Sequence, residues 1–422
     1  MPFLLNFCYL LAFLLAFPWL LWEALRKGKH REGFRSKFLG LVPIRVSHGK
    51  CVWFHAVSVG EVTLLPGLVE EFRKRRPEWE FVVSTSTATG MAIARKRFPG
   101  GTVFYCPFDF SWAVRAALRR IRPDLLVLAE LELWPNLISL AEEAGIPVCV
   151  VNGRLSVSSF RGYRRIRPFA ARVLRKMRLI AVQDETYAER FRDLGAPAEA
   201  VVVTGSMKFD GAATDRANPA TEALRRTAGF SNDDIVFLAG STQEGEESAA
   251  LGVFARLGEE HRRLRLVLVP RHPERFEAVA RLLERSGMPW SRRSGLTGGA
   301  KAQRILLVDT IGELGAWWGT ADIAFVGGSF GNRGGQNMIE PAAYGAAVSF
   351  GPNTRNFRDI VDTMLRAKAA VVVADAAELE MFVRRCLEEP ENAAELGRRA
   401  QALVRRQSGA MERTVELLEN FC

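Results

Sequence analysis

Residues 52–61 have the sequence VWFHAVSVGE, in which a short β-branched and aromatic run is followed by a glycine and an acidic residue. Such a run is typical of a buried strand, and the glycine turn after it predicts a helix that begins near Glu61. Along the rest of the chain, short apolar runs alternate with longer amphipathic ones in the same way. This alternation predicts βαβ units, and therefore a parallel sheet with helices on both faces.

The alternation occurs in two blocks. The first block contains candidate strands at 52–56, 80–84, 102–105, 125–128, 148–152, 179–183 and 201–204. The second contains candidate strands at 235–240, 264–270, 304–309, 323–327, 347–350 and 370–373. The polar stretch 210–234 between them is rich in helix and strand breakers, which predicts a connection between domains.

The fold class predicted from this pattern is α/β, with two doubly wound domains that face each other across a cleft. The length of 422 residues agrees with two domains of roughly 150 residues or more. The segment 391–421 is rich in arginine and glutamate, and we expect it to be helical and to brace the two lobes.

The N-terminal segment predicts a membrane anchor. Residues 2–22 carry no charged side chain, and only Asn6 and Pro18 interrupt an apolar run that nearly reaches the ~20 residues needed to cross a bilayer. A cleaved signal peptide is disfavoured, because no basic residues precede the run and no small-residue cleavage site follows it. Basic residues follow instead, at Arg26, Lys27, Lys29, Arg31, Arg35 and Lys37. By the positive-inside rule the main body lies in the cytoplasm; the alternative is a buried N-terminal helix.

The charge and the absent motifs limit the classes of function. With 58 Lys and Arg against 47 Asp and Glu, the net charge of +11 favours anionic partners. The six cysteines are far apart and no histidines cluster, so neither a zinc site nor a disulfide framework is indicated. The chain lacks GxGxxG with a distal acid, GxxxxGK[ST] and Asp-x-Asp, which leaves a metal-free, nucleotide-dependent transferase.

Three acidic residues are candidates for chemistry in the first block. Glu61 is either an ordinary first-turn acid that the helix dipole stabilises, or a general base in the cleft. Glu130 and Glu132 directly follow a buried-type strand, and they point to one side if the chain is still extended there. Glu132 has a structural alternative, since it can cap a helix that starts near Pro135.

Two further segments point to anionic ligands. Seven basic residues lie between Arg154 and Arg178, which suits anionic headgroups or substrate phosphates, whereas no recognised module supports nucleic acid. The stretch 327–341 is rich in glycine, which allows close approach of the backbone to a ligand. Gln336, Asn337 and Glu340 at its end can contact the hydroxyls of a ribose or the edge of a base.

Nine motifs together resemble the bacterial 3-deoxy-D-manno-octulosonic acid (Kdo) transferases in order and spacing. They are HAVSVGE (55–61), STSTATG (84–90), ELELWPN (130–136), NGRLS (152–156), TGSMKFD (204–210), GSTQEGEE (240–247), VPRHPERF (269–276), TIGEL (310–314) and GGSFGNRGGQNMIEP (327–341). The resemblance implies the two-lobed GT-B fold with an inner-membrane signal anchor. The implied parts are the anchor 1–25, an acceptor domain 26–212, a CMP-Kdo domain 213–400 and a C-terminal helix 401–422.

The resemblance also implies an activity and a set of residues. Kdo moves from CMP-Kdo to a lipid A precursor, lipid IVA, with inversion and without a metal or other cofactor. Glu61 matches the family's base, and Glu130 and Lys208 match residues that act on the transition state. The family's CMP-binding residues match Pro270, Arg271, Ile311, Gly312, Glu313, Asn337, Met338, Ile339 and Glu340.

The chain departs from the family pattern at two positions. Leu131 stands where threonine is expected between the two glutamates, and Gln336 stands where histidine is common. The alternatives to Kdo transfer are a GT-B transferase with another nucleotide sugar, such as a UDP-sugar, and a non-catalytic, membrane-tethered sensor of nucleotide or lipid.

Overall fold

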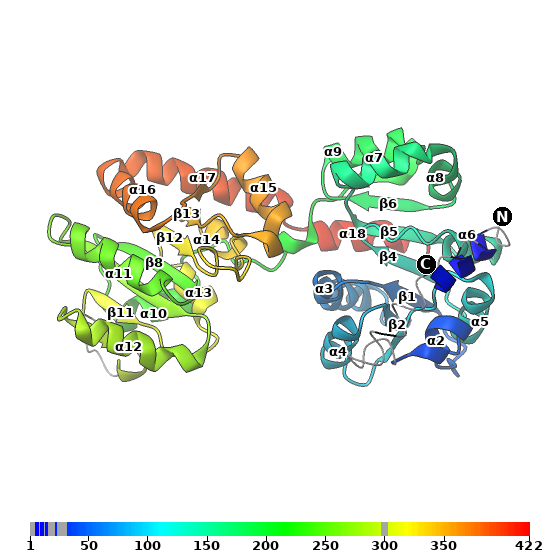
Figure 1. Cartoon of the computed structure of the whole chain (residues 1–422), viewed down its shortest axis with the longest axis horizontal. Helices are drawn as coiled ribbons and strands as arrows, with labels where there is room; N and C mark the ends of the chain where they lie inside the picture. The colour runs from blue at the N-terminus through cyan, green and yellow to red at the C-terminus, as the bar shows by residue number, and fades with distance from the viewer. Residues whose placement is uncertain (1–4, 8, 12, 16–21, 23–31, 297–302) are drawn as a thin grey trace. The chain divides into compact units, whose positions relative to one another are not determined.

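The structure is a computed structural model that describes residues 5–7, 9–11, 13–15, 22, 32–296 and 303–422. The chain divides into two compact units (Figure 1). Unit 1 comprises Met1–Asp210 together with Gln407–Cys422, and unit 2 comprises Gly211–Arg406. The chain therefore passes into unit 2 after Asp210 and returns to unit 1 at Gln407.

Unit 1 contains a seven-stranded parallel sheet with the strand order β3-β2-β1-β4-β5-β6-β7. Its strands are β1 Cys51–His55, β2 Glu80–Thr85, β3 Thr102–Tyr105, β4 Leu125–Ala129, β5 Val148–Gly153, β6 Leu179–Val182 and β7 Val201–Val203. Each of them overlaps a strand predicted in the first block, which confirms that prediction.

The helices of unit 1 cover both faces of its sheet. They are α2 Phe34–Leu39, α3 Val59–Arg75, α4 Ala88–Arg97, α5 Ser111–Ile121, α6 Pro135–Glu143, α7 Val157–Arg165, α8 Arg167–Leu174, α9 Glu185–Asp193 and α18 Ala410–Glu419. Along β1, Trp53 belongs to one hydrophobic core, whereas Val52 and Phe54 belong to the other. Because successive strand residues point to opposite faces, both faces of this sheet are buried, as in doubly wound folds.

Unit 2 contains a second seven-stranded parallel sheet, in the order β10-β11-β9-β8-β12-β13-β14. Its strands are β8 Ile235–Thr242, β9 Leu264–Pro270, β10 Trp290–Arg292, β11 Ile305–Leu307, β12 Ile323–Val326, β13 Ala347–Phe350 and β14 Val371–Val372. The six predicted strands of the second block are present. The sequence did not predict β10, because a three-residue edge strand with two polar residues has no apolar run.

The helices of unit 2 are α10 Pro219–Ala228, α11 Glu246–Leu257, α12 Phe276–Arg285, α13 Leu314–Trp318, α14 Ile339–Ala343, α15 Arg358–Arg366, α16 Ala376–Glu388 and α17 Pro390–Gln407. Short 3-10 helices lie at Ala198–Ala200, Met207–Phe209, Pro273–Arg275, Arg293–Gly295 and Arg355–Phe357.

The polar stretch 210–234 is not simply a connection, because α10 lies within it. The Asn218 side chain accepts a hydrogen bond from the N–H of Thr221, Pro219 is the first helical residue, and Gly229 ends the helix in the left-handed conformation. These are standard start and stop signals, but α10 has a largely polar sequence that hides its periodicity. The helix predicted over 391–421 is in fact two helices, α17 and α18, which a left-handed turn at Gly409 separates.

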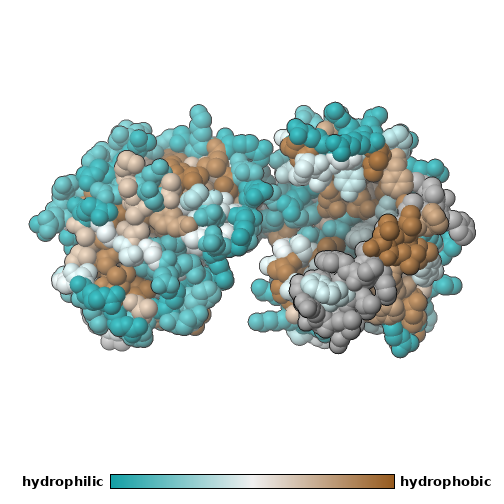
Figure 2. All heavy atoms as spheres, viewed as in Figure 1, coloured by the Kyte–Doolittle hydropathy of each residue, from teal (hydrophilic) through white to brown (hydrophobic). Residues whose placement is uncertain are grey.

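The N-terminal segment contacts unit 1 through its polar side chains. The predicted anchor falls largely on residues outside the described ranges, but residues 5–7, 9–11 and 13–15 are helical. The Asn6 amide donates to Ser111 Oγ over 2.8 Å, and the Tyr9 hydroxyl donates to Asp109 Oδ2 over 2.9 Å. The exposed side chains of this segment are apolar: Phe7, Leu10, Leu11, Leu14 and Leu15. Apolar side chains gather on this part of unit 1 in Figure 2. Among the helices that the structure describes, none combines the length and apolarity of a bilayer span.

Asp210 holds the returning chain in unit 1. Its carboxylate accepts hydrogen bonds from the N–H groups of Gly409, which caps α18, and of Ala410 and Met411, the first two residues of that helix. Helix α18 packs closely against α3, where a Cβ on Gly67 would lie 2.7 Å from Met411 Sδ. The carboxylate therefore satisfies N–H groups that have no acceptor within the helix.

We predict that Asp210→Ala weakens the attachment of α18 to unit 1 by about 1–3 kcal/mol, because three partly buried N–H groups lose a charged acceptor. Hydrogen–deuterium exchange of the α18 amides measures this loss as faster exchange. The exposed Asp193→Ala on α9 serves as the control and leaves α18 protected. Equal protection of α18 in the wild type and in Asp210→Ala would contradict the role of Asp210.

Candidate functional site

The site in unit 1 forms where its strand order reverses, between β1 and β4. These strands are paired neighbours in the sheet, although two other strands separate them in the sequence. In doubly wound sheets, ligands bind beyond the carboxyl ends of the strands at this position. Glu61 follows β1 and Glu130 follows β4, so the fold brings the two predicted acids to the same place.

Glu61 is both a helix-capping acid and an acid with raised proton affinity. Its side chain is 6% exposed, and its carboxylate accepts hydrogen bonds from the N–H groups of Val57 over 2.8 Å and Ser58 over 3.3 Å. Ser58 accepts in return from the Glu61 N–H, which completes a capping box. Burial raises the pKa of the Glu61 carboxyl, the hydrogen bonds from Ser58 and Val57 lower it, and the charge of Glu130 raises it. The geometry thus accommodates both interpretations of Glu61.

Glu130 lies between two cations. Its carboxylate forms ion pairs with Arg154 and with Lys208, whose Nζ lies 3.4 Å from Glu130 Oε1. The structure therefore brings together Glu130 and Lys208, as predicted, and adds Arg154, which the sequence did not single out as their partner. Lys208 lies in a 3-10 helix that is held in place where the Met207 N–H donates to Asn152 Oδ1.

The backbone at Glu130 is in an uncommon conformation. Its φ of 57° lies in the left-handed region, which costs a non-glycine residue of order 1–3 kcal/mol. The chain is therefore not extended at Glu130. The expectation that Glu130 and Glu132 point to the same side, as alternate residues of a strand do, does not apply. Such strain persists only where the surrounding structure enforces it, and here the buried carboxylate and its two cations do so.

Glu132 is the third acid of this site and holds its proton tightly. Burial, followed by the charge of Glu61, raises the pKa of Glu132 to about 8, although a hydrogen bond from Trp134 Nε1 opposes the shift. It does not cap α6, as its sequence position suggested. Asp109 performs that role instead, because its carboxylate accepts from the N–H groups of Asn136 and Leu137.

The site in unit 2 lies at the carboxyl ends of β9, β11 and β12. Pro270 ends β9, and the Arg271 side chain that follows is exposed. Burial raises the pKa of Glu340 and the charge of Arg271 lowers it, so these two side chains interact. Asn337 Nδ2 donates to Glu340 Oε1 over 3.0 Å. The structure therefore brings together residues 270–271 and 337–340, as predicted. Met338 and Ile339 are buried.

Residues 311–313 follow β11, which is paired with β9. Ile311 is 79% exposed, and Gly312 has a φ of 88°, which favours glycine. Glu313 is fixed by Arg293 over 3.0 Å, by the Thr310 hydroxyl and by Trp317 Nε1. This segment therefore presents an apolar side chain on a rigid turn, and the supporting Arg293 was not identified from the sequence.

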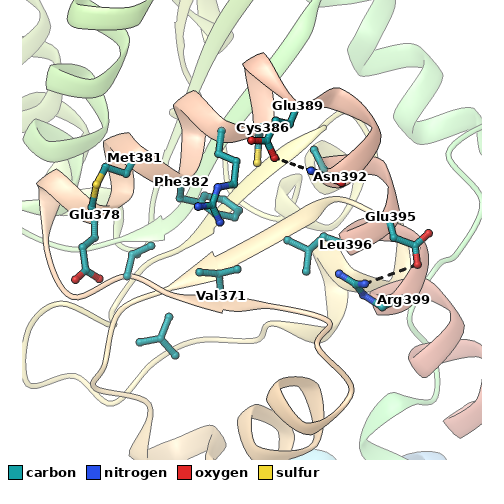
Figure 3. A pocket seen from close by; sticks show the side chains of 14 residues that line it. Val371, Glu378, Met381, Phe382, Cys386, Glu389, Asn392, Glu395, Leu396 and Arg399 are labelled. Carbon is teal, nitrogen blue, oxygen red and sulfur yellow. Dashed lines mark hydrogen bonds and ion pairs between the residues drawn. The ribbon is translucent and has the colours of Figure 1, made fainter.

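A cavity of about 460 Å³ in unit 2 lies apart from these residues. Figure 3 shows it between β14 and helices α16 and α17, with Val371, Phe382 and Leu396 on its walls. None of the predicted site residues lines it. Within the described ranges, no group of three or more His, Cys, Asp or Glu side chains is arranged to hold a metal ion.

Comparison with known proteins identifies the family. A family model described as 3-Deoxy-D-manno-octulosonic-acid transferase (kdotransferase) matches residues 29–211. The 3-deoxy-D-manno-octulosonic acid transferase of Bordetella pertussis is 34% identical over 418 residues, which cover 96% of this chain and 95% of the relative. The chain belongs to the Kdo transferase family. This confirms the resemblance predicted from the motifs, and with it an enzyme of the glycosyltransferase class.

Solved structures resemble the chain as well. The C-terminal CMP-Kdo binding domain of WaaA from Acinetobacter baumannii is 30% identical and covers 44% of this chain and 95% of that chain, with a TM-score of 0.41. The UDP-GlcNAc 2-epimerase from Neisseria meningitidis, bound to UDP-GlcNAc, covers 88% of this chain and 100% of its own at 12% identity, with a TM-score of 0.54. At that identity the likeness shows the fold alone: two Rossmann-like sheets in a GT-B-like chain.

The raised pKa of Glu132 makes the stability of this Kdo transferase depend on pH. The folded state holds the proton up to about pH 8, against an ordinary pKa of 4.5. The stabilisation from this group is therefore complete below pH 4.5 and is lost as pH rises through 8. Glutamine cannot ionise, so the free energy of unfolding of Glu132→Gln does not depend on this group. We therefore predict that the free energy of unfolding of Glu132→Gln, relative to that of the wild type, rises by about 2 kcal/mol between about pH 5 and about pH 9.

Urea unfolding at both pH values measures the difference. Glu143→Gln, an exposed change on α6, is the control and should follow the wild type. If the free energies of unfolding of Glu132→Gln and the wild type differed by the same amount at both pH values, Glu132 would ionise like an exposed acid.

Proposed function

We propose that the chain transfers Kdo from CMP-Kdo to a hydroxyl of a lipid A precursor, with inversion and with its own side chains as the catalytic groups. The observation that carries the proposal is the meeting of Glu61, Glu130 and Lys208 at one strand-order reversal, in a chain of the Kdo transferase family.

Glu61 is the proposed general base. In an inverting transfer, the acceptor oxygen forms a bond to the anomeric carbon while the bond from that carbon to the CMP phosphate breaks. The acceptor hydroxyl must lose its proton, and a carboxylate works best for this when its pKa lies closer to the working pH. Burial moves the pKa of Glu61 upward, in that direction.

Lys208 and Arg154 are the proposed positive charges of the site. Both pair with the buried Glu130, so their positions are set before any substrate binds. Preorganised charges stabilise a transition state because they need no rearrangement when charge develops. Here they oppose the negative charge of the Kdo carboxylate and of the departing phosphate.

Residues of unit 2 are proposed to bind the CMP group. Arg271 offers a planar guanidinium, which suits a phosphate. The exposed Ile311 offers an apolar surface for a base, and Asn337 with Glu340 offers polar groups for ribose or base. The proposed set is completed by Pro270, Gly312, Glu313, Met338 and Ile339.

We predict that Glu61→Gln lowers kcat by about 10²–10⁴-fold, because glutamine cannot accept the proton. The release of CMP from CMP-Kdo in the presence of a lipid A precursor measures the rate. The affinity for CMP should stay unchanged, which distinguishes lost chemistry from lost folding. Glu70→Gln, an exposed acid on the same helix, is the matched control. A near wild-type kcat for Glu61→Gln would refute the role of Glu61 as the general base.

We also propose that the chain is attached to the inner membrane through a single-pass anchor in its N-terminal segment, with the catalytic body on the cytoplasmic face. Attachment to lipid is supported by the exposed apolar side chains of Phe7, Leu10, Leu11, Leu14 and Leu15, because each contributes about 1.5–3 kcal/mol when it leaves water. The contacts of Asn6 and Tyr9 with Ser111 and Asp109 also join this segment to unit 1.

For this attachment, we predict that Leu11→Glu combined with Leu15→Glu lowers binding to phospholipid vesicles at least about tenfold, because charge is costly in an apolar layer. Cosedimentation with vesicles measures the bound fraction. Met381→Glu removes an apolar side chain of unit 2 that is 62% exposed, and it should leave binding unchanged. Undiminished binding of the double variant would mean that another surface holds the membrane.

A further inference from the structure

Glu246 is a buried carboxylate that accepts hydrogen bonds from four backbone amides. It is the first residue of α11 and is 1% exposed. Its Oε2 accepts from the N–H groups of Gln243 over 2.8 Å and Gly328 over 2.7 Å. Its Oε1 accepts from Ser329 over 2.9 Å and Phe330 over 3.0 Å. No ion pair among the described residues includes Glu246, so the four amides alone surround its charge.

These four amides lie where a doubly wound sheet ordinarily binds phosphate. They come from the loops after β8 and β12, which are paired neighbours on either side of the reversal in strand order. Converging backbone N–H groups at such a position form a cradle for an anion. In unit 2 the carboxylate of Glu246 occupies that cradle.

The cradle has no room for a second anion. A Cβ placed on Gly327 would lie 2.7 Å from Glu246 Oε2 and 2.6 Å from Thr242 Cα. Even a methyl group is therefore excluded beside the carboxylate, and a phosphate group is much larger. Gly327 is required here because the two loops approach each other so closely.

Two side-chain donors at this edge make no hydrogen bond within the described part of the chain. The Arg271 guanidinium makes no hydrogen bond or ion pair within the part of the chain that the structure describes. Gln243 Nε2 is buried and has no acceptor. The two residues are near each other, because the Arg271 N–H donates to the carbonyl of Thr242. The Arg271 guanidinium and the Gln243 amide can together bind one phosphate group. A second phosphate group would be repelled by the negative charge of Glu246.

We propose that Glu246 determines donor specificity: its carboxylate occupies the amide cradle at the reversal point of unit 2, so that the unit accepts a nucleoside monophosphate group and rejects a nucleoside diphosphate. This inference rests on the proposed function, in which the donor is a CMP-sugar. Glu246 acts here as a positioning residue, because it also holds the turn 328–330 that leads into the proposed CMP contacts.

The experiment compares CMP with CDP on the full chain by isothermal titration calorimetry. The wild type should bind CMP more tightly than CDP. Glu246→Ala should shift the ratio of the two dissociation constants toward CDP by about tenfold, which is the effect expected from one charged hydrogen bond. Glu244→Ala, which removes an exposed acid from the same loop, should keep the wild-type ratio.

Inorganic phosphate provides a second readout. In Glu246→Ala the four amides are open, so phosphate should bind there and raise the melting temperature, since a ligand of the native state stabilises it. The wild type and Glu244→Ala should show no such rise. A purely structural role of Glu246 predicts lower stability without any change in the ratio of CMP to CDP affinity. Glu246→Gln, which keeps the shape and one acceptor oxygen, replaces the alanine variant if that variant does not fold.

The outcomes separate the two proposals. An unchanged ratio in a folded Glu246 variant, or tighter binding of CDP than of CMP by the wild type, would overturn the role of Glu246. A wild type that binds neither nucleotide would overturn the proposed donor site, and the phosphate titration would still show whether Glu246 fills an anion cradle.

Discussion

The parallel pairing of β1 with β4, and of β8 with β12, is the constraint on which both candidate sites depend. Parallel strands end at the same edge of a sheet, so loops that are distant in the sequence begin side by side. At a reversal of strand order the following helices go to opposite faces, which leaves space between the two loops. Glu61 and Glu130 meet for this reason in unit 1. In unit 2 the same geometry brings the 243–246 loop to the 327–330 turn.

The two units treat a buried negative charge in different ways. In unit 1, Glu130 is balanced by Arg154 and Lys208, and the nearby Glu61 and Glu132 hold protons more tightly than usual. Burial is the main cause of both upward shifts in pKa, and the charge of a neighbouring carboxylate adds to each of them. In unit 2, the charge of Glu246 is stabilised by hydrogen bonds from four backbone amides. The first arrangement can exchange protons with a substrate, whereas the second is a fixed part of the fold.

Much of the fold was predictable because the relevant signals are local. Strands buried on both faces have short β-branched runs, and these located all the strands except β10, whose three residues form an edge. Helix α10 was missed although Asn218, Pro219 and Gly229 mark its ends, because its polar surface hides the apolar periodicity. The motifs located Glu61, Glu130 and Lys208, but nothing local indicated that Arg154 would pair with Glu130 or that Asp109 would replace Glu132 as the cap of α6.

The sequence by itself determined the family and the order of the strands and helices other than β10 and α10, since both depend on short patterns read along the chain. Only the tertiary structure decided which acids keep their protons and which are paired. The proton affinity of Glu132 depends on burial and on the charge of Glu61 from another strand end, and the environment of Glu246 depends on amides that follow β12. Electrostatic energies depend on distance and burial in space, and separation along the chain determines neither.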